Sequence, residues 1–449
     1  MILVVRNVLF NSFLALAVCS SFTVCLFFGG EFAGKPSVKV CAYTGVAARL
    51  VSGSTLHRVF KLPVQRDGRL VELPPLTGMF LRTMSLEWSG IEFLIIDEIS
   101  MVAYEILCMV DARLRQLKFK DVLFGDVNVL LFGDLMQLSP FGGNPVFKQP
   151  LRLVPATHLW RLFHLVELKE NMRQQGDNTF VDILNALRVG ELTADHLRVL
   201  SSKVSDEAEG EFAIDRALRI YPTNKMVSEH NEAVLNKFKQ ANVQVFLIKA
   251  QDVLVDEMRP RGDVPIDDIV PSDINKTGGF PQKLEIFVGA KVMLRSNVDV
   301  RRGLVNGAIG CVEEIIWSAF RRGQMYDTDI PSVRVNFEKD GVHVIEPKTI
   351  QFPGLHNYGT IERRMLPLVL CWACTVHKMQ GCTVDYAVIY LGMHLFAAGQ
   401  AYVALSRVRS LDGLRIQALD LSKLTGKTPC NKDALEEMHR MRAYSVERT

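Results

Sequence analysis

Short runs of apolar residues recur along the chain, and small or polar residues follow each one. In the first third these runs are Val38 to Tyr43, Phe93 to Ile96 and Val127 to Phe132. An unbroken apolar run of this length is typical of a strand that is buried on both faces, as in a parallel sheet. The same pattern returns later at Leu218 to Tyr221, Leu366 to Trp372, Tyr386 to Leu391 and Leu414 to Leu419.

The segments between these runs favour helices, because apolar residues recur in them at helical spacing. The clearest are Tyr104 to Leu117 and Phe180 to Arg188. Strands that alternate with helices predict an α/β fold with parallel sheets. From about Val243 to Phe352 the sequence is rich in Pro, Gly and Asp and then in short strands such as Ala290 to Leu294. That segment predicts a small β domain inserted into the second α/β half.

The composition narrows the class of protein. A chain of 449 residues, 48% of them hydrophobic, is long enough for two or three folded domains. The formal charge of +3 is too small to predict nucleic-acid binding, so any basic surface must be local. Paired arginines such as Arg363-Arg364 are expected on solvated loops. Nine scattered cysteines indicate a reducing, intracellular compartment, and the lone C-x-x-C at Cys371 and Cys374 predicts buried thiols rather than a zinc site.

The acidic pair Asp97-Glu98 directly follows the run Phe93 to Ile96. Ligands of parallel sheets collect at the carboxyl ends of the strands, which is where this pair falls. One acid that holds Mg²⁺ and a second that orients a water molecule are the usual arrangement for nucleotide hydrolysis. The pair therefore predicts a phosphate site at this edge of the sheet.

A second strand end carries Gly133-Asp134, followed by Gln137. A glutamine beside hydrolytic acids is suited to sensing a γ-phosphate through its amide. The alternative is an ordinary turn in which Asp134 caps a helix. Arg173 and Arg407 matter if nucleotide binds between domains, because a guanidinium that reaches the transferring phosphoryl group contributes about 10³–10⁵ in rate. The alternative for each arginine is a surface ion pair.

A third cluster, Thr375-Val376-His377-Lys378-Met379-Gln380-Gly381, follows the run that ends at Trp372. Hydroxyl, imidazole, ammonium and amide donors at a strand end suit phosphodiester contacts, which position a nucleic acid without reading its bases. Thr44, Thr55 and His57 offer similar donors in the first half. The alternatives are a polar helix start and, for His377, a buried and satisfied imidazole.

The order of these motifs is specific. The segments LIIDEIS, FGDLMQL, ENMRQ, GLVNGAIG, TVHKMQG and AYVALSR, in that sequence, resemble the petite-integration-frequency helicases. These are RecD-like superfamily-one DNA helicases, which move five-prime to three-prime, and the resemblance runs from about Val38 to Leu421. It implies two RecA-like domains with ATP between them, single-stranded DNA across their tops, and a small β-barrel insertion that includes Gly303 to Val312.

The resemblance also implies roles for single residues. Asp97 would hold Mg²⁺, Glu98 would activate water, and Gln137 would contact the γ-phosphate. Arg173 and Arg407 match arginine fingers, and Gln380 and Gly381 match nucleotide-binding positions. Six further positions match DNA contacts in the family: Thr44, Thr55, His57, Thr375, His377 and Lys378.

The same resemblance implies the organisation and setting of the chain. The expected parts are an apolar segment at 1–37, a first RecA-like domain at 38–160, a second at 161–242 and 353–428, the β insertion at 243–352 and a tail at 429–449. The partners would be single-stranded DNA and duplex junctions. Family members act in telomere maintenance, replication, repair and recombination, in the nucleus or the mitochondrion, and helicases of Helitron-type transposons look similar.

The nucleotide-binding loop is where the sequence departs from the family. A P-loop ends in Gly-Lys-Ser/Thr and feeds a helix, whereas Gly29 to Lys35 fits G-x-x-x-x-G-K but is followed by Pro36. From Lys35 to Val38 three steps cover at most about 11 Å. A strand of ordinary length spans about 17–20 Å. No crossover helix fits into that gap, so the first RecA-like domain is expected to lack a working P-loop.

Several interpretations of the N-terminal segment stay open. Asn7 to Gly30 holds no charged residue. It fits an incomplete gene model, a degenerate chain that binds DNA but hydrolyses ATP poorly, a membrane anchor, or a strand that covers the first sheet. The rival function classes are a non-enzymatic nucleic-acid-binding module and an ATPase that acts on proteins or small molecules.

Overall fold

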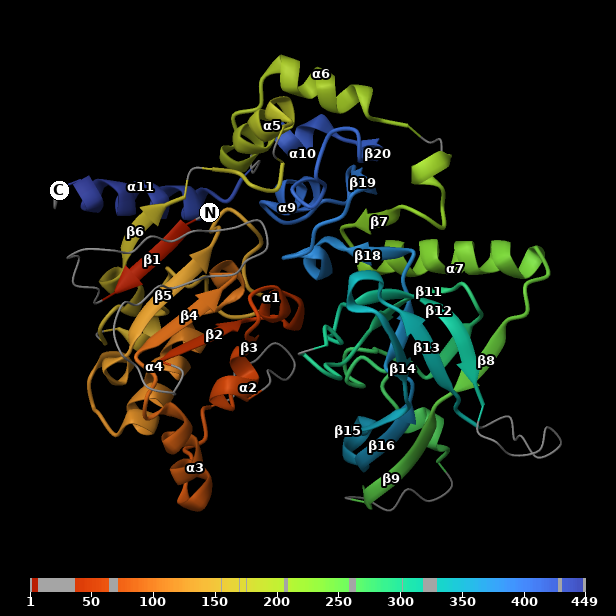
Figure 1. The fold of residues 1–449 in the computed structure, drawn as a ribbon, viewed down its shortest axis with the longest axis horizontal. Coiled ribbons are helices and arrows are strands. Elements are labelled where there is room, and N and C mark those ends of the chain that lie inside the picture. Colours follow the sequence, from red (N-terminus) through yellow and green to blue (C-terminus); the bar gives the residue numbers. More distant parts are fainter. Residues whose placement is uncertain are drawn as a thin grey trace. The chain divides into compact units, whose positions relative to one another are not determined.

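The chain forms two compact units (Figure 1). The computed structural model describes residues 2–6, 37–63, 72–154, 156–168, 170–174, 176–205, 209–257, 264–300, 302–317, 329–426 and 430–446. The first unit comprises Met1–Glu207, Ile220–Pro222 and Thr375–Thr449, and the second comprises Ala208–Arg219 and Thr223–Cys374. Among the described residues, no helix is both long and apolar enough to cross a membrane.

A six-stranded sheet forms the centre of the first unit, in the order β3-β2-β4-β5-β1-β6. Neighbours among β3, β2, β4 and β5 pair in parallel. The apolar runs thus form parallel strands, as the sequence predicts. The bounds are β1 Ile2–Arg6, β2 Val38–Ala42, β3 Ser54–Thr55, β4 Phe93–Asp97, β5 Asn128–Gly133 and β6 His164–Glu167.

The strand β1 runs opposite to its neighbour β5 and also pairs antiparallel with β6. Ile2 lies opposite Gly133, at the carboxyl end of β5, and Arg6 lies opposite Val129, near the start of that strand. The next described strand, β2, also begins at this far edge, since Val38 pairs with Phe93. The chain thus leaves β1 and enters β2 at the edge opposite Asp97 and Gly133. Asn7 to Gly30 and Gly29 to Lys35 lie outside the described residues.

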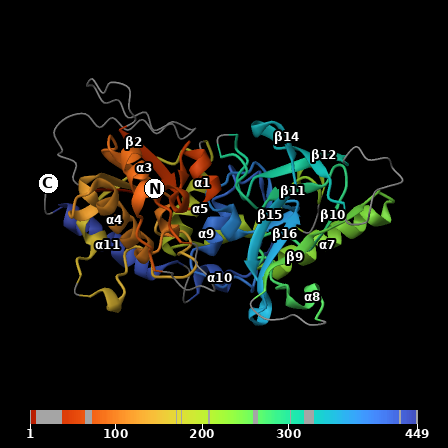
Figure 2. The ribbon, with the colours of Figure 1, turned by 90° about the horizontal axis from the view of Figure 1, so that it is seen from below.

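Helices α4 and α11, which are labelled in Figure 2, pack on one face of this sheet and complete its core. One large apolar cluster joins Leu94 and Leu131 of the sheet to Leu107 of α4 and Met438 of α11. Burying a leucine or methionine side chain of this kind contributes about 1.5–3 kcal/mol. The helices of this unit are α1 Gly45–Leu50, α2 Leu56–Phe60, α3 Gly78–Trp88, α4 Tyr104–Lys118, α5 Asn178–Val189, α6 Ala194–Ser202, α9 Gln400–Leu405, α10 Leu421–Thr425 and α11 Lys432–Val446.

A smaller four-stranded sheet has the order β18-β7-β19-β20, and the chain passes between the units within β7 and β18. Its strands are β7 Leu218–Tyr221, β18 Ala373–Thr375, β19 Ala387–Leu391 and β20 Leu414–Leu419. The prediction of one sheet strand at Leu366 to Trp372 is wrong in detail. That run contains the short β17 Leu368–Leu370, which pairs antiparallel with β11 of the second unit. The strand that leads into Thr375 is β18.

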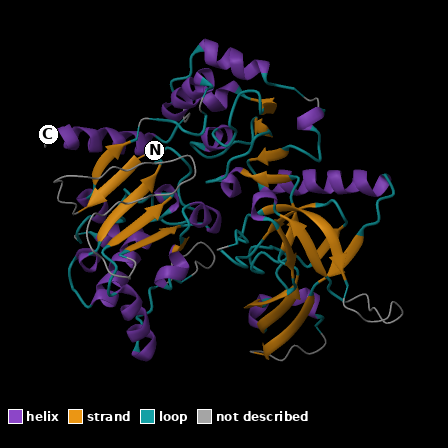
Figure 3. Ribbon diagram, in the orientation of Figure 1, coloured by secondary structure: helices purple, strands orange, loops and turns teal. Residues whose placement is uncertain are grey.

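The second unit is rich in antiparallel strands (Figure 3). Five of them form the order β14-β13-β12-β11-β17, three form β15-β16-β9, and two form β10-β8. Closure of these strands into a barrel, and the domain boundaries given above, stay predictions. The remaining bounds are α7 Asn224–Gln240, β8 Phe246–Lys249, β9 Gln251–Glu257, α8 Ile266–Ile269, β10 Lys283–Ile286, β11 Lys291–Leu294, β12 Ile309–Ile316, β13 Ser332–Asn336, β14 Val342–Ile345, β15 Lys348–Pro353 and β16 Gly359–Met365.

Two expectations about single residues of this unit are settled by burial. Cys371 and Cys374 are buried thiols, as predicted. The expectation of a solvated loop at Arg363-Arg364 is wrong for Arg363, which lies inside β16. Its guanidinium is 1% exposed and binds both carboxylate oxygens of Asp252, at 2.8 and 2.7 Å. A charge is tolerated there because its partner is buried with it.

Candidate nucleotide-hydrolysis site

The acidic pair lies at the carboxyl end of β4, where the sequence predicts it. Glu98 has φ 52°, a left-handed conformation that is uncommon for residues other than glycine and that clusters at functional sites. Burial and the neighbouring charge of Glu98 raise the pKa of Asp97 above its ordinary value. Burial also raises the pKa of Glu98, although the charges of Arg407 and Arg173 oppose that shift. Both acids thus lie in an environment of low polarity, and Glu98 is near the positive charges of Arg407 and Arg173.

Arg407 follows helix α9, and its guanidinium is almost completely buried. It donates from Nε to Val403 O at 2.8 Å, from Nη1 to Cys382 O at 3.2 Å and from Nη2 to Ser406 Oγ at 2.7 Å. Burial lowers the pKa of Arg407, and the charge of Glu98 works against that shift. These bonds fix the guanidinium in one place, so Arg407 is not the surface ion pair that the alternative interpretation holds.

Arg173 lies in a turn next to the same segment. Its Nη1 donates to Ser406 O at 2.9 Å, and Gln174 beside it donates from Nε2 to Val408 O at 2.7 Å. Burial and the charge of Arg407 lower the pKa of Arg173 to about 10, with Glu98 opposing. Arg173 therefore stays charged at neutral pH. The two predicted arginines are brought together, and both act on Glu98.

Two glutamines from separate motifs meet beside the acid. Gln380 donates from Nε2 to Ser100 Oγ at 3.0 Å and lies 3.4 Å from Gln137 Oε1. A Cβ added at Gly381, where φ is +85°, would lie 3.6 Å from Glu98 Oε1. Gln380 Oε1 and Glu98 Oε2 are buried without a hydrogen-bond partner among the described residues. Buried polar atoms are nearly always paired, so these two mark a place where a polar ligand fits.

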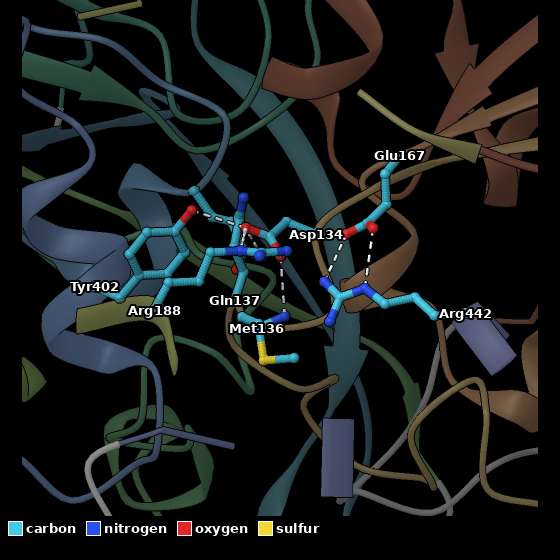
Figure 4. A network of polar contacts seen from close by, with 8 residues as sticks. Asp134, Met136, Gln137, Glu167, Arg188, Tyr402 and Arg442 are labelled. Carbon is cyan, nitrogen blue, oxygen red and sulfur yellow. Dashed lines mark hydrogen bonds and ion pairs between the residues drawn. The ribbon is translucent and has the colours of Figure 1, made fainter. Parts of the chain in front are cut away.

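Asp134 is the centre of a polar network that the sequence does not predict (Figure 4). Arg188 of α5 donates to it from Nε at 3.0 Å and from Nη2 at 2.7 Å, and Tyr402 of α9 donates its hydroxyl at 2.8 Å. Burial alone would raise the pKa of Asp134, but the charge and hydrogen bonds of Arg188 outweigh it and lower that pKa. Asp134 does accept from Met136 N at 3.1 Å, but it caps no helix, so the capping alternative is wrong.

The candidate DNA contacts of the first half lie around α1 and α2. Thr44 is the N-cap of α1, and its Oγ1 accepts from Ala47 N at 3.2 Å. Thr55 precedes α2 without a side-chain capping bond. The His57 ring packs edge-on against Tyr43, with centroids 5.5 Å apart, and burial lowers the pKa of His57. A role in DNA binding stays a prediction for all three.

The candidate contacts of the second half follow β18. Thr375 is 6% exposed. The His377 ring stacks on Phe396, with centroids 6.1 Å apart and planes at 18°, and burial lowers the pKa of His377. Lys378 follows in the same short helical turn. This segment approaches α1 at Gly381, where an added Cβ would lie 3.7 Å from Ala47 Cβ. Gly381, which follows this turn, thus lies next to α1, and a role in DNA binding stays a prediction for Thr375, His377 and Lys378.

The residues present fit a magnesium ion only as part of a nucleotide complex. Mg²⁺ is usually bound by one or two carboxylates together with phosphate oxygens and water, and Asp97 offers such a carboxylate at the strand end. Across the described part of the chain, no group of three or more His, Cys, Asp or Glu side chains is arranged to hold a metal by itself.

An acid pair at the carboxyl end of a parallel strand, with two arginines near it, is typical of α/β proteins that hydrolyse nucleotides. The chain belongs to the PIF1-like helicase family. Residues 33–198 match the model described as PIF1-like helicase, and residues 271–315 match that of the DNA helicase Pif1 2B domain. The chain is 34% identical over 394 residues to the ATP-dependent DNA helicase PIF1 of Danio rerio, an alignment that covers 86% of this chain and 55% of the relative. The chain spans about half the length of the curated relatives that it matches.

Solved structures agree with this assignment. The Pif1 helicase from Candida albicans superimposes with a TM-score of 0.69 at 25% identity, covering 91% of this chain and 89% of that one. The Pif1 helicase from Bacteroides in complex with ADP-AlF3 and ssDNA gives a TM-score of 0.65 at 28% identity, covering 92% and 89%. The likeness confirms the predicted α/β class with parallel sheets, a fold consistent with RecA-like domains.

Proposed function

We propose that this chain is the motor region of an ATP-dependent DNA helicase of the Pif type, which moves five-prime to three-prime on single-stranded DNA. One observation carries the proposal. A buried carboxylate oxygen of Glu98 has no hydrogen-bond partner among the described residues, and it faces two charged arginines beside Gln137 and Gln380. A site of this kind is suited to a phosphoryl group and an attacking water molecule.

Each residue has a distinct task in this proposal. Glu98 holds the attacking water and accepts its proton, which typically contributes about 10²–10⁴ in rate. Arg173 and Arg407 place positive charge where negative charge develops on the phosphoryl oxygens. Gln137 orients the γ-phosphate end of the nucleotide through its amide. Mg²⁺, held by Asp97, would neutralise the charge of the phosphates.

A second candidate function rests on the direction of β1. A phosphate-binding loop has to follow a strand at the edge where Asp97 lies, but β1 ends at Arg6 on the opposite edge. A chain with this arrangement would bind single-stranded DNA through the Thr375–Lys378 segment and hydrolyse ATP slowly or not at all. Both candidate functions use the same predicted DNA-binding residues. They differ in the rate of ATP hydrolysis.

Hydrolysis of ATP by the purified full chain, with and without single-stranded DNA, separates the candidates. The helicase proposal predicts DNA-stimulated hydrolysis that Glu98→Ala abolishes, while oligonucleotide binding stays unchanged. Binding without any stimulated turnover above the Glu98→Ala level would overturn the helicase proposal and leave the DNA-binding candidate. ATP hydrolysis at the same rate with and without DNA would instead favour an ATPase that acts on another substrate.

The partners, the cellular role and the compartment of the protein are part of the same proposal. The relatives named above carry out ATP-dependent DNA chemistry by name, and one solved structure holds single-stranded DNA. We infer from this that the partners are single-stranded DNA and duplex junctions, in DNA repair, recombination or telomere maintenance. The compartment that fits these tasks is the nucleus or the mitochondrion.

A further inference from the structure

We propose that Gln174 is a positioning residue, which sets the spacing between Arg173 and Arg407 in the hydrolysis site. The inference rests on the proposed function, because it concerns how two residues of that same site are held. Gln174 lies in the turn before α5, and its partners follow α9, the helix that packs beside α5 in the first unit (Figure 1). The motif ENMRQ contains Gln174, but the sequence predicts no task for it.

The first observation is the direction of the Gln174 amide. Its Nε2 donates to Val408 O at 2.7 Å and to Ser406 O at 3.4 Å, so one amide group holds the carbonyls on both sides of Arg407. Gln174 is only 2% exposed. Carbonyl oxygens accept hydrogen bonds and cannot donate them, so the nitrogen of this amide has to face them. The place therefore requires a neutral side chain that donates.

The second observation is that Arg173 uses the same carbonyl. Its Nη1 donates to Ser406 O at 2.9 Å, beside the Nε2 of Gln174. Arg407 is fixed through bonds to its own helix and its neighbour, from Nε to Val403 O and from Nη2 to Ser406 Oγ. Arg173 reaches across to the backbone beside Arg407, so its position depends on how the turn that carries it is held.

The third observation is that the two arginines repel each other. After burial, the charge of Arg407 is the next cause that lowers the pKa of Arg173. Like charges in a site of low polarity move apart unless other bonds hold the backbones that carry them. The Gln174 amide supplies such bonds and adds no negative charge that would compete with a phosphate for the two guanidiniums.

The position of Arg173 matters because an arginine finger acts in one place. Its charge has to meet the charge that develops in the transition state, and a misplacement of about 1 Å can cost about 100-fold in rate. The ordinary alternative is a buried glutamine that only satisfies two carbonyls of the core. Loss of such a residue would lower stability, but it would not single out the transition state from the bound nucleotide.

Binding of ADP, with and without aluminium fluoride, tests the inference on the full chain with Mg²⁺ and oligothymidine present. ADP with aluminium fluoride imitates the phosphoryl group during transfer, so the ratio of the two dissociation constants reports on the arginines. We expect Gln174→Met to reduce this preference by about 10- to 100-fold, with little change in the affinity for ADP alone. In steady-state hydrolysis the variant should lower kcat and leave KM nearly unchanged.

Gln116→Met is the matched control. Gln116 belongs to α4, and its Nε2 also donates to a backbone carbonyl, Leu76 O at 2.8 Å. Both variants should lower the midpoint of thermal unfolding, but Gln116→Met should leave the preference for aluminium fluoride unchanged. The Gln174→Met chain should still fold, because Asp177 holds the same turn through a bond from Leu411 N to its Oδ2 at 2.8 Å.

A double-mutant cycle gives the decisive comparison. If Gln174 acts through Arg173, Gln174→Met should have little further effect in the Arg173→Ala chain. An unchanged preference, equal losses for both ligands, or a loss that adds in full to that of Arg173→Ala would overturn the inference while the proposed function stands. If the unchanged chain shows no preference for aluminium fluoride, the arginines do not act as proposed, and the proposed function fails together with this inference.

Discussion

Arg188 binds Asp134 through both oxygens of the carboxylate, with Nε 3.0 Å from Oδ2 and Nη2 2.7 Å from Oδ1. The carboxylate side chain is 5% exposed and the arginine side chain 17%. Asp134 lies three residues before Gln137, and Tyr402 binds the same carboxylate from the helix that leads to Arg407. Asp134 therefore holds the strand-end loop that contains Gln137 against α5 and α9. The second of these helices leads to Arg407.

We expect the buried pair to matter far more for stability than an exposed pair of the same chemistry. Breaking a buried ion pair by removing one partner costs about 3–5 kcal/mol, because the remaining charge is left uncompensated. Arg188→Met should lower the free energy of unfolding by that amount, measured by chemical denaturation. The double variant Arg188→Met with Asp134→Asn should lose less than the sum of the single losses, since no charge stays unpaired.

Arg442 and Glu167 supply the matched control (Figure 4). They form the same two-bond contact, at 2.9 and 2.7 Å, but their side chains are 42% and 33% exposed. Arg442→Met should change the free energy of unfolding by only about 0–1 kcal/mol, since water screens the pair. Equal losses for Arg188→Met and Arg442→Met would show that burial does not govern the Asp134 contact.

The same contact predicts a dependence of stability on acid. Arg188 lowers the pKa of Asp134 in the folded chain below the ordinary value of about 3.9. Its contribution is fully present above that ordinary value and is lost as the pH falls through the lowered pKa of the folded state. The Asp134→Asn variant should therefore lose less stability than the unchanged chain as the pH falls below about 4. Parallel acid-unfolding curves for the two proteins would contradict this assignment.

Gly399 should resist substitution because its backbone lies against another loop. It has φ +76°, and an added Cβ would lie 2.5 Å from Met136 O. Gly399→Ala should be destabilised both by the left-handed backbone conformation and by the clash between Cβ and Met136 O. At Gly176, where φ is +88° and nothing lies within 4 Å, alanine meets only the first cost, about 1–2 kcal/mol. Thermal unfolding should therefore show a larger loss for Gly399→Ala, and equal losses would mean that the loop moves aside freely.

Asp97 gives a prediction for the metal. If this carboxylate holds Mg²⁺ together with phosphates, Asp97→Asn should raise the Mg²⁺ concentration needed for half-maximal binding of a non-hydrolysable ATP analogue by about tenfold or more. Binding of a fluorescent analogue during a Mg²⁺ titration measures this shift. Asp111→Asn serves as the control, because Asp111 belongs to α4 and pairs with Arg115 on the same helix. An unchanged Mg²⁺ midpoint for Asp97→Asn would remove this residue from the metal site.

The predictable part of the fold and site is the part that depends on local pattern. Apolar runs mark β2, β4 and β5, and the acids at the ends of β4 and β5 fall where a parallel sheet must place them. The run from Leu366 to Trp372 is misleading because a pattern of apolar residues does not say which sheet a strand joins. The direction of β1 is hidden for the same reason.

The residues missed by sequence reasoning act through distant partners. Arg188 is an ordinary basic residue near the end of α5, and Tyr402 reads as part of an apolar helix. Their importance follows only from the position of Asp134, which lies far from both in the sequence.

The reversed strand β1 also has a consequence for the order in which the first unit is completed. Its five residues come first in the chain, yet their partners are β5 and β6, which end at Gly133 and Glu167. Contacts between segments so distant in sequence are costly to close and tend to form late in folding. During synthesis the ladder between β1 and β6 therefore cannot be completed until Glu167 has emerged. The last ladder to form is then the one that closes the β6 edge of the sheet.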